Sequence, residues 1–169
     1  MDIIKFAMKM ELDGKAYYEK QAEATSNSEL KKILLNLAEE EERHFQYFKS
    51  LIDNPTDNPS LAGFNDPDAK EKILNIFEEL AGQTAPEPFG DDVIETWKNA
   101  RLIEEKAVAF YKQQAAEQSV RARKDLLLLI AKEEYRHVLM IDGVLTWLRQ
   151  PATFAESAQY KNFRSLEGR

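Results

Sequence analysis

Residues 38–44 read AEEEERH and residues 131–137 read AKEEYRH, so the chain carries one short pattern twice, 93 residues apart. The similarity extends well beyond these stretches. Residues 3–52 align with residues 96–145 without a gap, and sixteen of the fifty positions are identical. Unrelated sequences share far fewer residues by chance, so the two halves are an internal duplication. Both histidines of the chain, His44 and His137, stand at equivalent positions of the repeat.

Apolar residues recur at helical spacing in both halves, as Leu30, Ile33 and Leu34 do in the first. Neither half shows the alternation of apolar and polar residues that is typical of a strand. The sequence therefore predicts an all-α protein in which each half is a helical hairpin. We expect the two duplicated hairpins to pair as a four-helix bundle over residues 1–149, one domain at this length.

Polar clusters mark the predicted turns. Ser26 and Glu29 fit the S-x-x-E capping box at the start of a second helix, and Ser119 is a weaker cap candidate at the equivalent place. A long crossover, residues 53–91, holds most of the prolines. It is too long for a bare loop in a compact domain, so we expect a helix within it over 67–81, ending at Gly82. The tail, residues 150–169, is expected to form a short helix.

Each half also repeats a set of polar residues. A glutamate is followed seven residues later by a tyrosine, and thirty residues later by Glu-x-x-His. A glutamate and a histidine three residues apart lie on one face of a helix. A glutamate and a tyrosine seven residues apart, which is two turns, also share a face. The repeated residues are Glu11, Tyr18, Glu41 and His44 in the first half, and Glu104, Tyr111, Glu134 and His137 in the second.

The spacing also predicts that these side chains share one level. Ser26 lies fifteen residues after Glu11 and fifteen before Glu41, and Ser119 has the same relation to Glu104 and Glu134. In a hairpin folded at that serine, both glutamates lie about 22 Å from the turn. Pairing two such hairpins brings four glutamates and two histidines to one layer. Uncompensated carboxylates in a core repel one another and lose hydration, whereas two divalent cations would balance all four.

The amino-acid composition excludes several kinds of metal site and of binding partner. The chain has 169 residues, 30 of them acidic and 23 basic, and no cysteine. Without thiolates, iron–sulfur clusters and structural zinc–thiolate sites are excluded. A net charge of −7 argues against a nucleic-acid partner. No apolar run approaches a membrane span and no secretory signal is present, so we expect a cytoplasmic protein with no membrane partner.

At this ligand pattern the chain resembles the ferritin-like superfamily, and within it rubrerythrin-like di-iron proteins and bacterioferritin. The resemblance implies a ferritin-like four-helix bundle with two iron ions, or manganese or a mixed metal pair. It also implies that Glu11 and Glu104 are terminal ligands, that Glu41 and Glu134 bridge the metals, and that His44 and His137 bind one metal each. Tyr18 and Tyr111 would hydrogen-bond the ligand carboxylates. We further expect Glu40 and Glu133, duplicated next to the bridging ligands, each to accept the ring N–H of the opposite half's histidine.

Three features depart from those relatives. Rubrerythrins typically carry an additional carboxylate three residues after the ligand glutamate of the third helix, where this chain has Ala107, with Gly14 as its repeat mate. We expect these small residues to leave an open face for oxygen or peroxide. Bacterioferritin has a haem-binding methionine where this chain has Glu42, so no haem is expected. The cysteines of a rubredoxin domain are absent.

The leading hypothesis is an oxidoreductase that reduces hydrogen peroxide or oxygen at a carboxylate-bridged dimetal centre. It would need an external electron donor, such as a rubredoxin-like protein, and we expect a homodimer or higher homo-oligomer. One alternative is a ferroxidase that feeds iron storage in a ferritin-type shell. The other is a non-enzymatic bundle that uses metal for stability alone.

Overall fold

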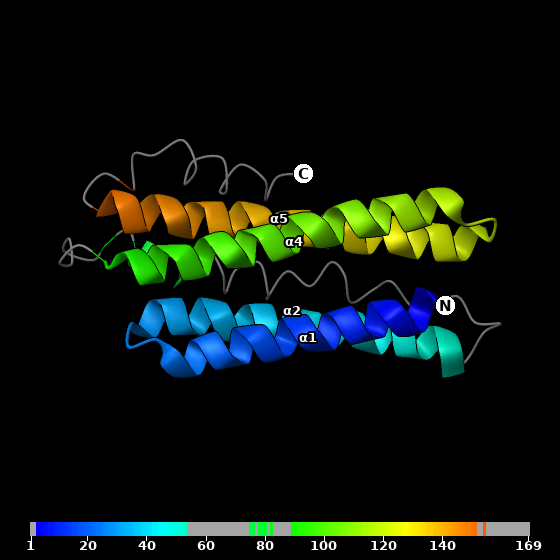
Figure 1. Cartoon of the computed structure of the whole chain (residues 1–169), viewed down its shortest axis with the longest axis horizontal. Helices are drawn as coiled ribbons and strands as arrows, with labels where there is room; N and C mark the ends of the chain where they lie inside the picture. The colour runs from blue at the N-terminus through cyan, green and yellow to red at the C-terminus, as the bar shows by residue number, and fades with distance from the viewer. Residues whose placement is uncertain are drawn as a thin grey trace. The chain divides into compact units, whose positions relative to one another are not determined.

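The fold is given by a computed structural model, which describes residues 3–53, 75, 76, 78–80, 82, 89–151 and 154. The long helices are α1 (Ile3–Ala24), α2 (Ser28–Asp53), α4 (Asp91–Glu117) and α5 (Arg121–Arg149) (Figure 1). The described residues are mostly helical with no strand, which confirms the predicted all-α fold class. No helix in this part of the chain is long and apolar enough to cross a membrane.

The helices pair as two hairpins, α1 with α2 and α4 with α5, as Figure 1 shows. The chain forms two compact units, Met1–Pro67 and Asp68–Arg169, and each unit contains one hairpin. The turns fall where the repeat predicts them, after Ala24 and after Glu117. The two hairpins are therefore confirmed, and their union in one domain over residues 1–149 stays a prediction.

The duplication is visible in the register of the buried residues. The first helix of each hairpin buries a narrow stripe whose members recur every three or four residues, with Val108 as one addition in the second hairpin, as one face of a helix requires. In α1 the stripe is Ile4, Ala7, Glu11, Gly14, Tyr18 and Ala22. In α4 it is Trp97, Ala100, Glu104, Ala107, Val108, Tyr111 and Ala115. Every α1 member maps onto an α4 member by the same shift of 93 residues, so the two hairpins bury equivalent faces.

The cap of α2 differs from the prediction. The side-chain Oδ1 of Asn27 accepts hydrogen bonds from the backbone N–H groups of Glu29, at 3.1 Å, and Leu30, at 3.0 Å. Asn27 is therefore the N-cap, one residue after the predicted Ser26, and it satisfies two amides of the first turn. At the equivalent place in the second hairpin, α5 begins after Val120 with no side-chain cap, so the prediction for Ser119 is wrong.

Part of the crossover packs on α5 within the second unit. Residues 75, 76, 78–80 and 82 are helical, which agrees with the predicted crossover helix, and the predicted end of that helix just after Gly82 lies outside the described residues. The indole Nε1 of Trp147 donates a hydrogen bond of 3.1 Å to the backbone oxygen of Leu80, and both side chains are buried. The contact ties this part of the crossover to the C-terminal end of α5. The predicted tail helix lies outside the described residues except for Pro151 and Phe154.

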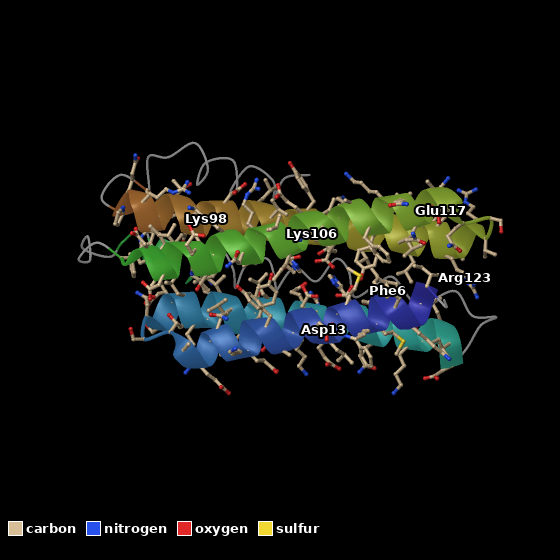
Figure 2. All side chains as sticks on the ribbon, viewed as in Figure 1. Phe6, Asp13, Lys98, Lys106, Glu117 and Arg123 are labelled. Carbon is tan, nitrogen blue, oxygen red and sulfur yellow. The ribbon has the colours of Figure 1, made fainter. Side chains whose placement is uncertain are left out.

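Charged side chains occupy the exposed faces of the helices, among them Asp13 and Lys106 (Figure 2). One ion pair links the helices of each hairpin at its edge. Lys15 Nζ lies 3.0 Å from Glu42 Oε2 between α1 and α2. Arg101 Nε lies 2.6 Å from Asp142 Oδ1 between α4 and α5. These pairs are partly exposed and contribute little stability, but they agree with the register of the buried stripes.

Candidate metal centre

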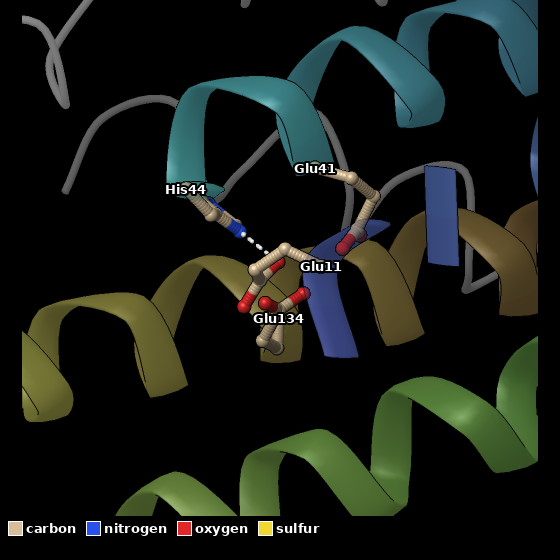
Figure 3. Close-up of side chains that lie close together, drawn as sticks. All are labelled: Glu11, Glu41, His44 and Glu134. Carbon is tan, nitrogen blue, oxygen red and sulfur yellow. Dashed lines mark hydrogen bonds and ion pairs between the residues drawn. The ribbon is translucent and has the colours of Figure 1, made fainter. Parts of the chain in front are cut away.

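The first hairpin brings Glu11 of α1 together with Glu41 and His44 of α2, here called the first triad. The imidazole Nδ1 of His44 lies 3.3 Å from Oε2 of Glu11 (Figure 3). Each of the three residues offers one ligand atom, and these atoms lie within 4.8 Å of one another. All three side chains are buried. Helix α2 places Glu41 and His44 on one face because they are three residues apart, and the buried stripe of α1 places Glu11 opposite them.

The second hairpin repeats this arrangement with Glu104 of α4 and with Glu134 and His137 of α5, the second triad. The Nδ1 atom of His137 lies 3.0 Å from Oε2 of Glu134 and 3.5 Å from Oε1 of Glu104. These residues also offer ligand atoms within 4.8 Å of one another, and all are buried. The six predicted ligands therefore assemble as two equivalent groups of two carboxylates and one imidazole.

In the second triad, burial and neighbouring charges shift the pKa values of Glu104 and His137. Burial raises the pKa of Glu104 to about 7, because loss of hydration penalises the carboxylate, although the charge of His137 acts in the opposite direction. Burial lowers the pKa of His137, but the adjacent carboxylates of Glu104 and Glu134 outweigh it and raise this pKa to about 9. Without a metal, the triad therefore retains protons at neutral pH. A cation that binds these atoms would replace those protons.

Gly14 lies against the first triad, a contact that the sequence did not predict. A Cβ atom added to Gly14 would lie 3.0 Å from Oε2 and 3.3 Å from Cδ of Glu41. The side of Gly14 that was expected to be open to oxygen or peroxide is thus filled by a carboxylate. Helical spacing could not predict this contact, because it depends on how closely α1 approaches α2.

Tyr18 and Tyr111 are fully buried members of the two stripes. Each makes an edge-on contact with the aromatic residue before it. The ring centroids of Tyr17 and Tyr18 are 5.6 Å apart, and those of Phe110 and Tyr111 are 5.3 Å apart. The two tyrosines are therefore held in equivalent places by packing. Their predicted hydrogen bonds to the ligand carboxylates stay a prediction.

Glu40 and Glu133 are buried, and each pairs with an arginine three residues later. Both carboxylate oxygens of Glu133 accept from Nη1 of Arg136, at 2.9 and 2.7 Å. On α2, Nη2 of Arg43 pairs with Oε2 of Glu40. The repeat thus includes a second duplicated pair beside the triads. The predicted hydrogen bonds of Glu40 and Glu133 would each join a glutamate of one hairpin to the histidine of the other. They stay a prediction.

The chemistry of the two triads fits a metal ion. In each, two carboxylates and one imidazole are buried where unbalanced charge is costly, and one divalent cation would balance the two carboxylates. Oxygen and nitrogen ligands without sulfur suit first-row ions such as iron and manganese. Each triad is therefore a carboxylate–histidine group able to bind a metal.

The comparisons with known proteins point the same way. The family model described as Rubrerythrin matches residues 2–145, which include both hairpins and all six residues of the triads. No curated protein and no solved structure matches the chain significantly. Because the matched region spans most of the chain and carries the duplicated carboxylate–histidine groups, this chain belongs to the rubrerythrin family.

Proposed function

We propose that this protein is a non-haem di-iron oxidoreductase that reduces hydrogen peroxide or oxygen, its first and second triads together holding two iron ions. The observation that carries the proposal is the buried triad of two carboxylates and one imidazole, present once in each hairpin. A stabilising role alone would not require the same set of oxygen and nitrogen ligands in both halves.

The proposed ligand roles follow the repeat. Glu11 and Glu104 come from the first helix of each hairpin and would be terminal ligands. Glu41 and Glu134 would bridge the two ions, and each histidine would bind one of them. Since four carboxylates carry four negative charges, two ferrous ions neutralise the set. Manganese or a mixed pair would satisfy the same ligands.

A bound pair of ferrous ions would supply two electrons, which with two protons reduce one hydrogen peroxide to two waters, or one oxygen to hydrogen peroxide. The chain contributes the surroundings of that reaction. Burial of the triads excludes bulk water and strengthens the electrostatic interactions around the site. Nδ1 of His137, which lies between Glu104 and Glu134, must lose its proton before that atom can bind metal. The electrons are then restored by an external donor, for which a small rubredoxin-like protein is suitable, and we propose that the protein works as a homo-oligomer.

The test is anaerobic loading of the metal-free chain with ferrous iron, followed by addition of peroxide or oxygen. We expect near-ultraviolet absorbance to rise as one peroxide is consumed for every two ferrous ions. The double variant His44→Ala/His137→Ala should consume almost none. Glu39→Gln, which changes an exposed carboxylate on the same helix, is the matched control and should behave as the wild type.

Two other outcomes would contradict the proposal. Absence of colour change and of oxidant consumption would exclude redox chemistry at the triads. Continued oxidation of excess ferrous iron, with many ions retained per chain in a large closed shell, would instead favour iron storage. Size-exclusion chromatography distinguishes such a shell from a dimer or tetramer.

A further inference from the structure

Gly14 is an unexpected residue for the middle of a long helix. Glycine is the least favourable helix former after proline, because fixing its backbone costs the most entropy. It nevertheless lies within α1, in the buried stripe between Glu11 and Tyr18. A residue that weakens its helix in this way calls for a local reason.

Backbone conformation does not supply that reason. No glycine in the described part of the chain has a positive φ angle, so Gly14 is not needed for a left-handed conformation. The surroundings of its missing side chain do supply one. The nearest atoms to an added Cβ are Oε2, Cδ and Cγ of Glu41, at 3.0, 3.3 and 3.6 Å. The space that a side chain would fill is occupied by a carboxylate from the neighbouring helix.

The second hairpin has a different residue at this position of the stripe. Ala107 is the repeat mate of Gly14 and is buried in α4, as Gly14 is in α1. The two triads have identical ligands, yet the first has no side chain where the second has a methyl group. The duplicated ligand sets are therefore not equivalent in the space around them.

We infer that Gly14 is a positioning residue for Glu41, and that it makes the first triad's metal affinity depend on the absence of a Cβ at this place. An alanine here would push the Glu41 carboxylate from its observed position by a few tenths of an ångström or rotate it away. The inference rests on the proposed function, because it takes Glu41 to be a metal ligand.

The test compares Gly14→Ala with wild type by titrating the metal-free chain with Co(II), whose visible spectrum reports coordination. Wild type should bind two ions. Because Glu41 would bridge the two ions, Gly14→Ala should bind both ions more weakly, at least one of them by tenfold or more, with a changed spectrum. The reciprocal variant Ala107→Gly is the control. It removes a methyl group instead of adding one, so it should weaken neither ion even though it lowers the melting temperature of the metal-free chain.

Thermal unfolding of the metal-free proteins separates positioning from simple stability. Alanine favours the helix, so Gly14→Ala should melt at or above the wild-type temperature while it loses metal affinity. If the variant melts lower instead, adding Glu41→Ala should restore the temperature, because it removes the carboxylate that meets the new Cβ. Failure to restore it would overturn the inference.

The two remaining outcomes distinguish this inference from the proposed function. If wild type binds two ions and Gly14→Ala binds both with unchanged affinity, Gly14 does not position Glu41 and the proposed function stands. If wild type binds no metal, the proposed function fails and the inference fails with it.

Discussion

Nδ1 of His44 lies 3.3 Å from Oε2 of Glu11, although the two residues are 33 positions apart in the chain. The contact forms because a hairpin turn lies midway between Glu11 and Glu41, so that α1 and α2 bring their polar residues to the same level. His137 and Glu104 repeat it at 3.5 Å in the second hairpin. A buried imidazole beside a buried carboxylate, present twice, is the structural basis of the predictions below.

Removal of either imidazole should remove metal. For His44→Ala and for His137→Ala we expect affinity for one ion to fall by tenfold or more, because each loses the only nitrogen ligand of its triad. Inductively coupled plasma mass spectrometry after iron loading and desalting gives the ion count. The exposed variant Glu39→Gln should keep the wild-type count. Unchanged stoichiometry in both histidine variants would refute the site.

Asn27 should contribute more to stability than Ser26. Loss of an N-cap costs about 0.5–2 kcal/mol, because amides of the first helical turn lose their acceptor. We therefore expect Asn27→Ala to lower the free energy of unfolding in urea by about 1 kcal/mol. Ser26→Ala should change it by much less. Equal losses in the two variants would contradict the assignment of the cap to Asn27.

The metal-free protein should lose stability as the pH rises from 6 toward 9. The folded chain holds protons on Glu104 and His137, whose pKa values are raised from 4.5 to about 7 and from 6.5 to about 9. Because the unfolded chain releases these protons at lower pH, their contribution to stability disappears as the pH passes through the folded values. Differential scanning calorimetry should show a falling melting temperature over this range.

The same protons compete with metal, so metal affinity should rise over that pH range. The variant His137→Ala is the control for the stability measurement, since it removes one of the two groups and should show a shallower fall. A melting temperature that is flat or rises from pH 6 to 9 would show that the second triad does not retain protons.

Losing Arg136 alone should reduce the free energy of unfolding more than losing both Glu133 and Arg136. Arg136→Gln leaves a buried carboxylate without its two charge-assisted hydrogen bonds. Breaking a fully buried pair costs about 3–5 kcal/mol, and because the Arg136 side chain is 34% exposed we expect about 1–2 kcal/mol. The double variant Glu133→Gln/Arg136→Gln has no unpaired charge, so chemical unfolding should show a smaller loss. A larger loss in the double variant would contradict this view of the pair.

Much of the site could be predicted from the sequence, because the repeat and the helical period constrain the same residues. Glu41 and His44 must share a face at a spacing of three, and the equal distances from Ser26 place Glu11 at their level. The hairpin contacts agree with both expectations. Residue spacing alone was sufficient for these features.

Other features depend on distances that spacing does not specify. Ser26 and Asn27 are both good N-caps, and only the path of the turn determines that the Asn27 side chain reaches the amides of Glu29 and Leu30. The contact of Gly14 with Glu41 requires the separation of α1 and α2. The pairing of Glu133 with Arg136 depends on which side-chain conformers the buried face permits.

If the two triads hold two redox-active metal ions, the protein purified from the cells that make it contains them, and metal analysis of that protein is the most direct test. Each triad has two carboxylates and one imidazole, so we expect two ions per chain, with iron as the main metal. Purification without chelators and quantification against amino-acid analysis give the ratio. Protein that contains no transition metal, or that keeps its metal in the double variant His44→Ala/His137→Ala, would contradict the claim.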